Sequence, residues 1–300
     1  MTCADQPDLN RSESTRRDAR YWQPAANNAV CCQLCPHRCL IRPGGSGVCQ
    51  ARRNLDGRLI AWSYGKITSL ALDPIEKKPL YRFHPGSWIL SAGSLGCNFH
   101  CGFCQNWTIS QREAPYRLIL PDEMAALARR AVPDGNIGLA YTYNEPLISF
   151  EYVLDCARLI RQAGLKNVLV TNGFINPEPL EELLPWTDAM NIDLKAWNQD
   201  FYHRICGGDV ETVKSVIARS ARTCHVEVTT LLLPGLNDDD DEIRALAAWL
   251  ASVDRRIPLH LTRHHPDYRM TEPQPISRAR MQQLAGLARQ QLADVFLGNI

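Results

Sequence analysis

Short apolar runs alternate with helical patterns from residue 87 onward, and this alternation limits the fold more than any other feature. The runs are Trp88–Ala92, Ile137–Tyr141, Asn167–Thr171, Ala189–Asp193, Val226–Leu232 and Pro258–Leu261. The helical patterns are Pro121–Ala131, Leu147–Ala163, Glu178–Leu184, Glu211–Arg222, Asp238–Leu250 and Ser277–Ala293. Such strand–helix repeats predict an α/β fold, a partial (βα)6 barrel with parallel strands and helices outside. In barrels of this kind the chemistry lies on the loops that leave the carboxyl ends of the strands.

Three cysteines lie in the loop that follows the first predicted strand. Cys97, Cys101 and Cys104 stand at positions i, i+4 and i+7, after a glycine-bounded turn. Three thiolates at this spacing can hold one face of an iron–sulfur cube, for which four ligands are usual. The iron without a protein ligand is then open to a bound molecule, as in catalytic metal sites. An accidental spacing among the 12 cysteines is disfavoured by the position of the loop at a strand end.

A second group of cysteines, Cys32, Cys35, Cys39 and Cys49, precedes the predicted barrel, with glycines between the last two. Four thiolates can close a tetrahedral zinc site or hold a second cluster, and the spacing fits either. A second cluster would relay electrons to the first, and buried cysteines without a metal are the third alternative. Because residues 30–60 contain little apolar sequence to fold unaided, structural zinc is the favoured interpretation.

Composition and charge describe the remaining segments. Residues 1–29 are polar and predict an N-terminal arm with a short helix around residues 16–22. Residues 30–86 form a small Cys-rich extension, with a turn at 54–57 and a solvated loop at 73–80, and residues 87–300 form the barrel. The net charge of +1 gives no argument for a nucleic-acid partner. No apolar run approaches the roughly 18 residues of a membrane span, and no signal peptide is evident, so we expect a cytoplasmic protein.

The cysteine loop resembles the radical S-adenosylmethionine (SAM) superfamily, in which an apolar or aromatic residue precedes the last cysteine, as Phe103 does here. The resemblance implies a 4Fe-4S cluster on Cys97, Cys101 and Cys104, with SAM bound to the fourth iron through its amino and carboxylate groups. One added electron then cleaves SAM to methionine and a 5′-deoxyadenosyl radical, which abstracts hydrogen from a substrate.

The string after the second predicted strand, Thr142-Tyr143-Asn144-Glu145-Pro146, is similar to the Gly-Gly-Glu-Pro of the same superfamily, with both glycines replaced. The resemblance implies that Glu145 holds the amino group of SAM through a charge-assisted hydrogen bond. The alternative is that Glu145 begins a helix and is favoured there by the helix dipole, and the two roles are compatible.

Two further strings resemble the activating enzymes of glycyl-radical enzymes: Thr171-Asn172-Gly173 and Asp193-Leu194-Lys195. The resemblance implies that Asn172, Asp193 and Lys195 lie around the ribose and carboxylate of SAM. Taken alone, either string also fits an ordinary turn or a capped strand end.

Three residues are weaker candidates. Cys206 lies in the loop after the fourth predicted strand, and it either touches the substrate or is a structural thiol. His260 is placed at the end of the sixth strand, above the cofactor, although strand histidines are usually satisfied core residues. Arg263 is expected to pair with a carboxylate of the substrate or of SAM.

Over most of its length the chain resembles the radical SAM member of the AmmeMemoRadiSam system, which is related to pyruvate formate-lyase activating enzymes. This implies a radical SAM enzyme with an unidentified substrate, which is a protein, an RNA or a small molecule, and a low-potential electron donor such as ferredoxin or flavodoxin. One alternative is activation of a glycyl-radical partner. An alternative of another class is a non-catalytic iron–sulfur or zinc protein, an electron carrier or sensor, which needs a fourth cysteine ligand.

Overall fold

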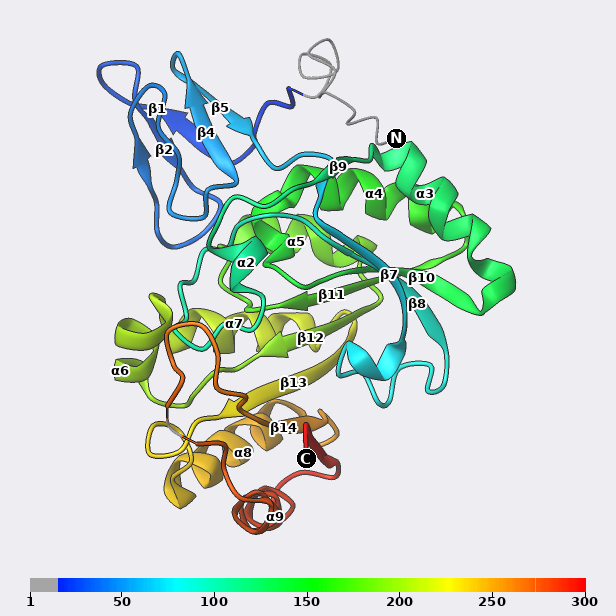
Figure 1. Cartoon of the computed structure of the whole chain (residues 1–300), viewed down its shortest axis with the longest axis vertical. Helices are drawn as coiled ribbons and strands as arrows, with labels where there is room; N and C mark the ends of the chain where they lie inside the picture. Colours follow the sequence, from blue (N-terminus) through cyan, green and yellow to red (C-terminus); the bar gives the residue numbers. More distant parts are fainter. Residues whose placement is uncertain (1–15, 273) are drawn as a thin grey trace, which may run out of the picture.

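The computed structural model describes residues 16–272 and 274–300 and is built around one open, eight-stranded sheet (Figure 1). The strand order across the sheet is β15-β14-β13-β12-β11-β10-β8-β7. The strands are β7 (Ser69–Pro74), β8 (Trp88–Gly93), β10 (Asn136–Tyr141), β11 (Lys166–Thr171), β12 (Ala189–Asp193), β13 (His225–Leu232), β14 (Leu259–Arg263) and β15 (Val295–Gly298). All neighbouring pairs are parallel except β7 with β8. The predicted partial barrel is therefore confirmed.

The sheet has two strands more than the sequence predicted. At one edge, β15 follows the last helix and pairs in parallel with β14. At the other edge, β7 runs antiparallel to β8, with Ser69 opposite Gly93 and Pro74 opposite Trp88. Proline is tolerated at such an edge because it has no ladder hydrogen bond to donate. The barrel sheet thus begins at Ser69, inside the segment 30–86 that the sequence assigned to the extension.

The predicted helices are present. The longer ones are α3 (Pro121–Arg130), α4 (Phe150–Gln162), α5 (Pro177–Leu183), α7 (Val210–Ser220), α8 (Asp240–Asp254) and α9 (Arg278–Ala288). Side chains of Asp209, Asp239 and Ser277 accept hydrogen bonds from the first turns of α7, α8 and α9 and so fix where these helices begin. The shorter ones include α2 (Trp107–Ser110), α6 (Gln199–Phe201) and the π-helical turn η5 (Tyr202–Cys206).

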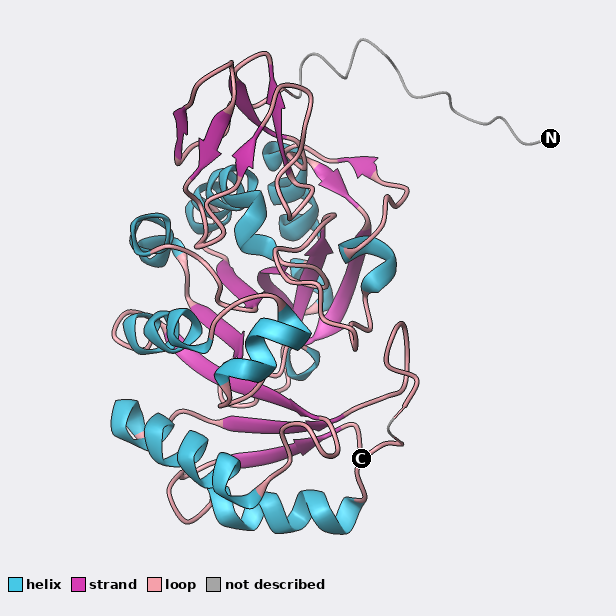
Figure 2. Cartoon of the chain, turned by 90° about the vertical axis from the view of Figure 1, so that its left-hand side faces the viewer, coloured by secondary structure: helices cyan, strands magenta, loops and turns pink. Residues whose placement is uncertain are grey.

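The helices and loops divide between the two ends of the strands. In Figure 1 the arrows of β11, β12 and β13 point left, toward α2, α6 and the orange loop that follows β14. Figure 2 looks onto this side, with the helices packed around the sheet and the small strands above it. The carboxyl ends of the central strands therefore face one common region, where the sequence places the chemistry.

The N-terminal extension consists of short antiparallel strands. A three-stranded sheet holds β1 (Trp22–Pro24), β2 (Val30–Cys32) and β3 (Leu40–Ile41). The expected turn at 54–57 joins β4 (Arg52–Leu55) to β5 (Arg58–Ala61), and β6 (Lys66–Ile67) pairs with β9 (Arg117–Leu118). The helix predicted around residues 16–22 is wrong, because this stretch enters β1 and Asp18 bridges to Ile60 in β5. Residues 1–15 of the predicted arm lie outside the described residues.

The extension packs on the barrel and has no separate core. Val30, Leu34, Ile41 and Leu59 belong to the same buried cluster as the apolar residues of the barrel. The scarcity of apolar residues in this segment is thus offset by packing against the barrel, which weakens the physical reason for expecting a structural metal there.

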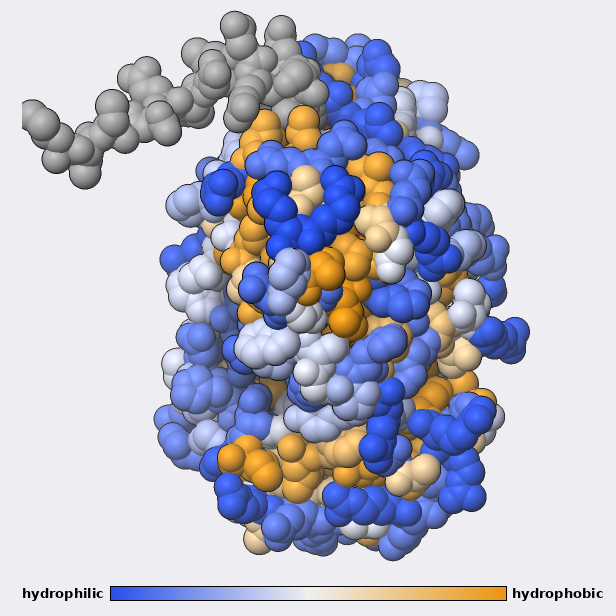
Figure 3. All heavy atoms as spheres, turned by 90° about the vertical axis from the view of Figure 1, so that its right-hand side faces the viewer, coloured by the Kyte–Doolittle hydropathy of each residue, from blue (hydrophilic) through white to orange (hydrophobic). Residues whose placement is uncertain are grey.

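The surface mixes hydrophilic and hydrophobic side chains, as Figure 3 shows for the face at the right of Figure 1. Large exposed apolar side chains are scattered along the chain, for example Leu40, Trp88 and Val132. In the part of the chain that the structure describes, no helix is long and apolar enough to cross a membrane.

Candidate active site

The three cysteines of the 97–104 loop lie directly beyond the carboxyl end of β8. Cys101 is buried, and Cys97 and Cys104 are half-buried. The loop is pinned from within, because Gly96 N donates to the Ile109 carbonyl at 2.9 Å and Gln111 Nε2 donates to the Phe99 carbonyl at 2.9 Å. The predicted position of this loop at a strand end is confirmed.

The sulfur atoms of this loop have the donors that a thiolate requires. Cys97 Sγ accepts from Phe99 N at 3.3 Å and from Asn172 Nδ2 at 3.7 Å. Cys104 Sγ lies 3.2 Å from Ser110 Oγ. Burial raises the pKa of the Cys97 thiol well above its ordinary value, so bound iron is needed to hold it as a thiolate. The donor set therefore fits an iron–sulfur cluster.

The three thiols do not form a ready-made site for a single metal ion. Among residues 16–272 and 274–300, no three His, Cys, Asp or Glu side chains converge closely enough to hold one metal ion. In a cube each ligand sulfur binds a different iron, and the sulfurs stand farther apart than around one ion.

Glu145 links the ends of two neighbouring strands. It is 2% exposed, and its Oε1 accepts from Leu147 N at 2.9 Å and from Thr171 Oγ1 at 2.6 Å. Its Oε2 accepts from Asn172 N at 2.7 Å. Glu145 caps the 3₁₀ turn η3 (Pro146–Ser149). Its contacts within the protein therefore agree with the expected role at the start of a helix. Burial raises its pKa to about 7, although these hydrogen bonds act in the opposite direction.

Asn172 connects Glu145 to the cysteine loop. Its side-chain amide donates to Asn98 Oδ1 at 2.9 Å as well as to Cys97 Sγ, and Asn98 Nδ2 donates to the Phe174 carbonyl at 2.7 Å. Through these bonds the loop after β11 holds the orientation of the cysteine loop after β8. The structure thus brings two of the predicted strings together at one edge of the sheet.

Asp193 and Lys195 follow β12 at the same edge. Lys195 Nζ donates to Asp193 Oδ2 at 2.5 Å, and both side chains are half-buried. Burial alone would lower the pKa of Lys195, but the negative charge of Asp193 and the nearby Cys101 raise it above its ordinary value. The ammonium group lies 6.0 Å from the centre of the Phe103 ring, so this charge sits beside the cysteine loop. A fixed cation here favours thiolates and an anionic ligand.

Tyr143 and Asn144, which stand before Glu145 where the superfamily has glycines, form contacts of their own. Tyr143 adopts φ of 70°, a backbone region that favours glycine, and its hydroxyl donates to Asp73 Oδ2 at 2.5 Å. Asn144 Oδ1 accepts from Ser94 N at 2.9 Å, and its Nδ2 donates to the Gly96 carbonyl at 3.0 Å. Asn144 thus clamps this loop to the segment that enters the cysteine loop.

The segment 73–80, predicted as a solvated loop, is solvated only in part. Lys78 is 2% exposed, and its Nζ donates to Asp73 Oδ2 at 2.8 Å and lies 4.4 Å from the Tyr143 ring centre. Because the aspartate is bound by both Lys78 and Tyr143, its pKa falls to about 2 despite the burial, which acts in the opposite direction. Two of the charged residues of this segment, Asp73 and Lys78, therefore form a buried ion pair, whereas Lys77 is exposed.

Comparison with known proteins decides the family. Residues 93–247, which include the three cysteines and Glu145, match the family model described as "Radical SAM superfamily". The chain belongs to the radical SAM superfamily. An uncharacterized protein of Methanocaldococcus jannaschii is 40% identical over 95% of this chain and 85% of its own length. The pyruvate formate-lyase 1-activating enzyme of Escherichia coli is 23% identical over 65% of this chain and 86% of its own length.

Solved structures agree on the fold. A radical SAM methyltransferase from Sphaerobacter thermophilus superposes with a TM-score of 0.54 at 18% identity, over 72% of this chain and 67% of its own. Streptococcus suis SuiB bound to S-adenosylmethionine superposes with a TM-score of 0.53 at 13% identity, over 68% of this chain and 48% of its own. The protein is thus a radical SAM enzyme, and its family implies a 4Fe-4S cluster and SAM.

Cys206 lies against a predicted cluster ligand of this radical SAM enzyme. It is 0% exposed, and a hydrogen bond from its thiol lowers the pKa of Cys101. Its carbonyl accepts from His100 N at 3.0 Å, and a Cβ on the next residue, Gly207, would meet the His100 ring at 2.0 Å. The turn η5 is therefore packed onto the cysteine loop, and the thiol faces a ligand rather than an open substrate site.

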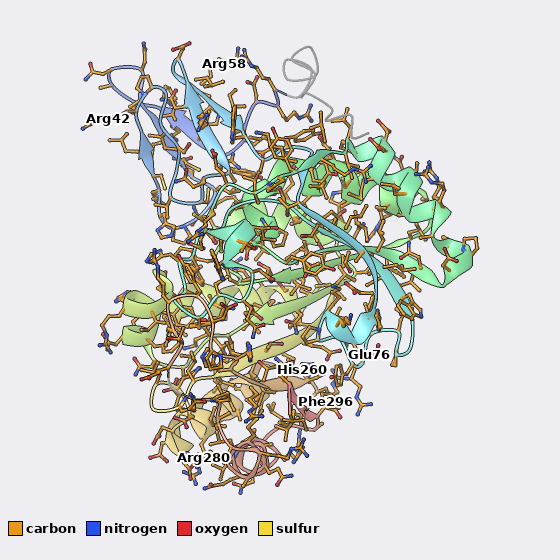
Figure 4. All side chains as sticks on the ribbon, viewed as in Figure 1. Arg42, Arg58, Glu76, His260, Arg280 and Phe296 are labelled. Carbon is orange, nitrogen blue, oxygen red and sulfur yellow. The ribbon has the colours of Figure 1, made fainter. Side chains whose placement is uncertain are left out.

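His260 is not where the sequence placed it. It is the second residue of β14, near the amino end of the strand, so the expected position at the carboxyl end is wrong. Its Nε2 lies 2.6 Å from Glu227 Oε2, and its ring packs on Phe296 and Tyr81 (Figure 4). Glu227 also accepts from the backbone of residues 81 and 82, so His260 is a satisfied core histidine.

Arg263 ends β14, at the carboxyl edge as expected. Its Nε donates to the Ile276 carbonyl at 2.9 Å, which holds the side chain against the loop that leads to α9. The pairing with a carboxylate stays a prediction.

The loop after β14 covers the cysteine loop, which the sequence did not reveal. Arg269 N donates to the Gly102 carbonyl at 3.0 Å. The side chain of Met270 lies beside Gly102, where a Cβ would be 3.2 Å from its Cγ. The rings of Tyr268 and Trp107 stack, with centroids 5.2 Å apart and planes at 15°. Residues 264–268 have no local pattern that would predict their contact with the cysteine loop.

His264 is a further residue that sequence reasoning did not single out. It is 1% exposed, directly follows the carboxyl end of β14, and neither ring nitrogen has a hydrogen-bond partner within the described residues. Burial lowers its pKa, which favours the neutral ring with one donor and one acceptor. A buried imidazole without partners is costly, so His264 joins the candidates for contact with SAM or substrate.

Proposed function

We propose that this radical SAM enzyme holds a 4Fe-4S cluster on Cys97, Cys101 and Cys104 and cleaves SAM to methionine and a 5′-deoxyadenosyl radical that takes hydrogen from a substrate. One observation carries the proposal most directly. The loops after β8, β10 and β11 are joined at one sheet edge, because Glu145 accepts from Asn172 N and the side chain of Asn172 donates to Cys97 and Asn98 in the cysteine loop. Such a shared edge is where barrel enzymes act.

The residues at this edge have distinct roles in the proposal. Glu145 offers a carboxylate to the SAM amino group, and its remaining lone pair on Oε2 is available beside the bond from Asn172 N. Lys195, held by Asp193, places a positive charge beside the cysteine loop, where it attracts the SAM carboxylate. The loop that carries Tyr268 and Met270 excludes water from the reacting atoms.

The test is SAM cleavage by anaerobically reconstituted protein with a chemical reductant. We expect 5′-deoxyadenosine and methionine in equal amounts. Cys101→Ala removes one of the three ligands, and both products should disappear together with the iron of this site. Cys224→Ala is the matched control, because this cysteine lies after α7, bonded to the Ser220 carbonyl, and should change nothing. SAM cleavage by the Cys101→Ala protein would contradict the site.

The substrate class is open between a protein, an RNA and a small molecule. Activation of a glycyl-radical partner is supported by the strings at Asn172 and Asp193–Lys195 and by the similarity to the Escherichia coli activating enzyme. Anaerobic incubation with pyruvate formate-lyase and SAM tests this directly, since activation produces the electron paramagnetic resonance signal of a glycyl radical. If this signal does not appear, the enzyme modifies a different substrate. Membership of the AmmeMemoRadiSam branch and a ferredoxin or flavodoxin donor stay predictions.

The non-catalytic alternative requires a fourth cysteine at the 97–104 cluster. The structure brings one candidate to this place, because Cys206 lies against Cys101. A cluster closed by Cys206 would bind no SAM, so the SAM-cleavage assay separates the two functions.

A further inference from the structure

Four of the five cysteines of the N-terminal extension line one largely enclosed cavity. Cys32 ends β2, Cys35 and Cys39 lie on either side of the turn before β3, and Cys49 precedes β4. Cys32 N donates to the Cys39 carbonyl at 3.0 Å, which closes the turn and points both side chains to the same space. Cys32, Cys35 and Cys49 are buried, and Cys39 is half-buried. Four thiols from four different positions thus surround a common space.

Four thiols can hold one zinc ion or one iron–sulfur cluster, and the groups beside them distinguish the two. A 4Fe-4S cluster binds one iron to each ligand sulfur and carries sulfide sulfurs of its own, which accept hydrogen bonds from the surrounding protein.

A buried cation without a complete set of acceptors lies in the wall of the same cavity. Arg52 is 1% exposed, and its terminal nitrogens donate to Glu151 and to the Arg20 carbonyl. Its Nε has no acceptor among the described residues. Leaving such a donor unpaired is destabilising, and sulfur atoms of an anionic group in the cavity would accept from it. The positive charge lies near Cys32 and Cys49, whose thiolates it would stabilise.

The cavity shares a wall with the active site. Asn98, which follows the cluster ligand Cys97, lines the cavity, and its carbonyl accepts from His37 Nε2 at 2.7 Å. The segment that enters the cysteine loop also touches the extension, because a Cβ on Gly96, which has φ of 85°, would lie 2.2 Å from the Cys49 carbonyl oxygen. A redox group in the cavity would therefore be the immediate neighbour of the active-site loop.

We propose that Cys32, Cys35, Cys39 and Cys49 hold a second 4Fe-4S cluster that passes single electrons to the cluster at Cys97, Cys101 and Cys104. The transfer step rests on the proposed function, whereas the second cluster does not. A low-potential one-electron donor of the ferredoxin or flavodoxin class reduces the second cluster by one electron. That electron moves to the first cluster, the second returns to its oxidised state, and no bond is formed or broken.

The side of the cavity away from the active site suits an incoming donor. Cys39 is the most exposed of the four ligands, and the next residue, Leu40, is 68% exposed. Arg38 and Arg42 are exposed on either side of it, and Figure 4 shows Arg42 at the outer end of the extension. An apolar side chain rimmed by cations fits an acidic electron carrier.

The metal content of the anaerobically purified full chain tests the second cluster without any variant. We expect about eight irons and no zinc per chain. One zinc with four irons would overturn the proposal in favour of the structural zinc, and four irons without zinc would overturn it as well. Cys101→Ala should keep about four irons even though SAM cleavage is lost, so failure of the first site is distinguishable from failure of the second.

Variants then test the electron path. Cys35→Ala together with Cys39→Ala should keep four irons and SAM cleavage with a chemical reductant, but lose most SAM cleavage with reduced flavodoxin as the donor. Cys31→Ser is the matched control, since its thiol contacts only the Arg38 carbonyl, at 3.7 Å, and does not line the cavity. It should keep eight irons and both activities. Equal flavodoxin-driven cleavage by wild type and the double variant would overturn the electron path.

If the double variant is insoluble, electron paramagnetic resonance of the reduced wild-type protein decides the same question. Two neighbouring reduced clusters broaden and split each other's signals. Sharp, independent signals would contradict neighbouring clusters.

Discussion

Tyr268, on the loop after β14, stacks on Trp107, the first residue after the cysteine loop to enter α2. The two residues are far apart in sequence, and their contact is what lays the 264–270 loop over the cysteines. The guanidinium carbon of Arg112 lies 4.3 Å from the centroid of the Trp107 ring, so a cation–π contact adds to the stack. This aromatic pair thus holds the cover of the active site together with the hydrogen bond from Arg269 N to the Gly102 carbonyl.

Removal of this stack should open the cover. A stacked aromatic pair contributes about 0.5–1.5 kcal/mol, so Tyr268→Ala should raise the open population about 2- to 10-fold. The rate at which air bleaches the visible absorbance of the cluster should rise by the same factor. Tyr268→Phe keeps the ring and is the matched control. Equal bleaching in all three proteins would show that the loop does not shield the site.

Glu145 should make SAM binding depend on pH. Because burial raises the pKa of Glu145 to about 7, the carboxyl group is mostly neutral below this pH and ionised above it. The ammonium group of SAM prefers the ionised form, so affinity should rise as the pH rises through about 7. In Glu145→Gln the pH dependence should vanish and affinity at high pH should fall about 5- to 30-fold, for a loss of about 1–2 kcal/mol. Calorimetry with cluster-loaded protein measures both, and an unchanged affinity would leave only the helix-start role.

Cys206 should tune the cluster rather than bind it. Its thiol lies beside Cys101 and lowers the pKa of that residue, and a thiol that donates to a ligand sulfur raises the reduction potential of a cluster. Cys206→Ala should therefore lower the midpoint potential of the active-site cluster, and Cys206→Ser, which keeps a donor, should restore it in part. Iron content should stay the same in both. Loss of iron in the serine variant would instead identify Cys206 as a fourth ligand.

Gly96 should tolerate no side chain. Its positive φ costs an alanine about 1 kcal/mol or more, and the added Cβ would lie 2.2 Å from the Cys49 carbonyl oxygen. Gly96→Ala should therefore lower the unfolding free energy by several kcal/mol, in the range of severe substitutions. Gly286→Ala, inside α9 with nothing near the new methyl group, should be neutral or stabilising. Thermal denaturation of the two variants side by side measures the contrast.

The sequence predicted those parts of the fold that depend on local periodicity. The six central strands and the position of Cys97 at a strand end follow from apolar runs and from the rule that parallel strands share a carboxyl edge. The edge strands β7 and β15 were not predicted, because each is defined by its pairing with a neighbouring strand and not by a pattern in its own sequence. His260 was misplaced for the same reason, since the start of β14 at Leu259 depends on its register with β13.

Some residues of the candidate site could likewise be predicted from the sequence, and others could not. Cys97, Glu145 and Lys195 could be predicted because their strings carry the chemistry. The burial of Lys78, the pairing of Tyr143 with Asp73 and the closeness of Cys206 to Cys101 could not, because each joins segments distant in sequence. A charged residue between prolines is more often solvated, and only the tertiary structure shows the ion pair.

The ion pair between Arg52 and Glu151 bears on how the chain is made. The two residues are 99 positions apart, and both side chains are 1% exposed. At about 5–20 residues per second, the ribosome adds Glu151 some 5–20 s after Arg52. During that interval Arg52 lacks its partner, and the five cysteines of the extension lack the packing that buries most of them in the folded chain. The wall of the cavity proposed for the second cluster is therefore completed only after α4 has been synthesised.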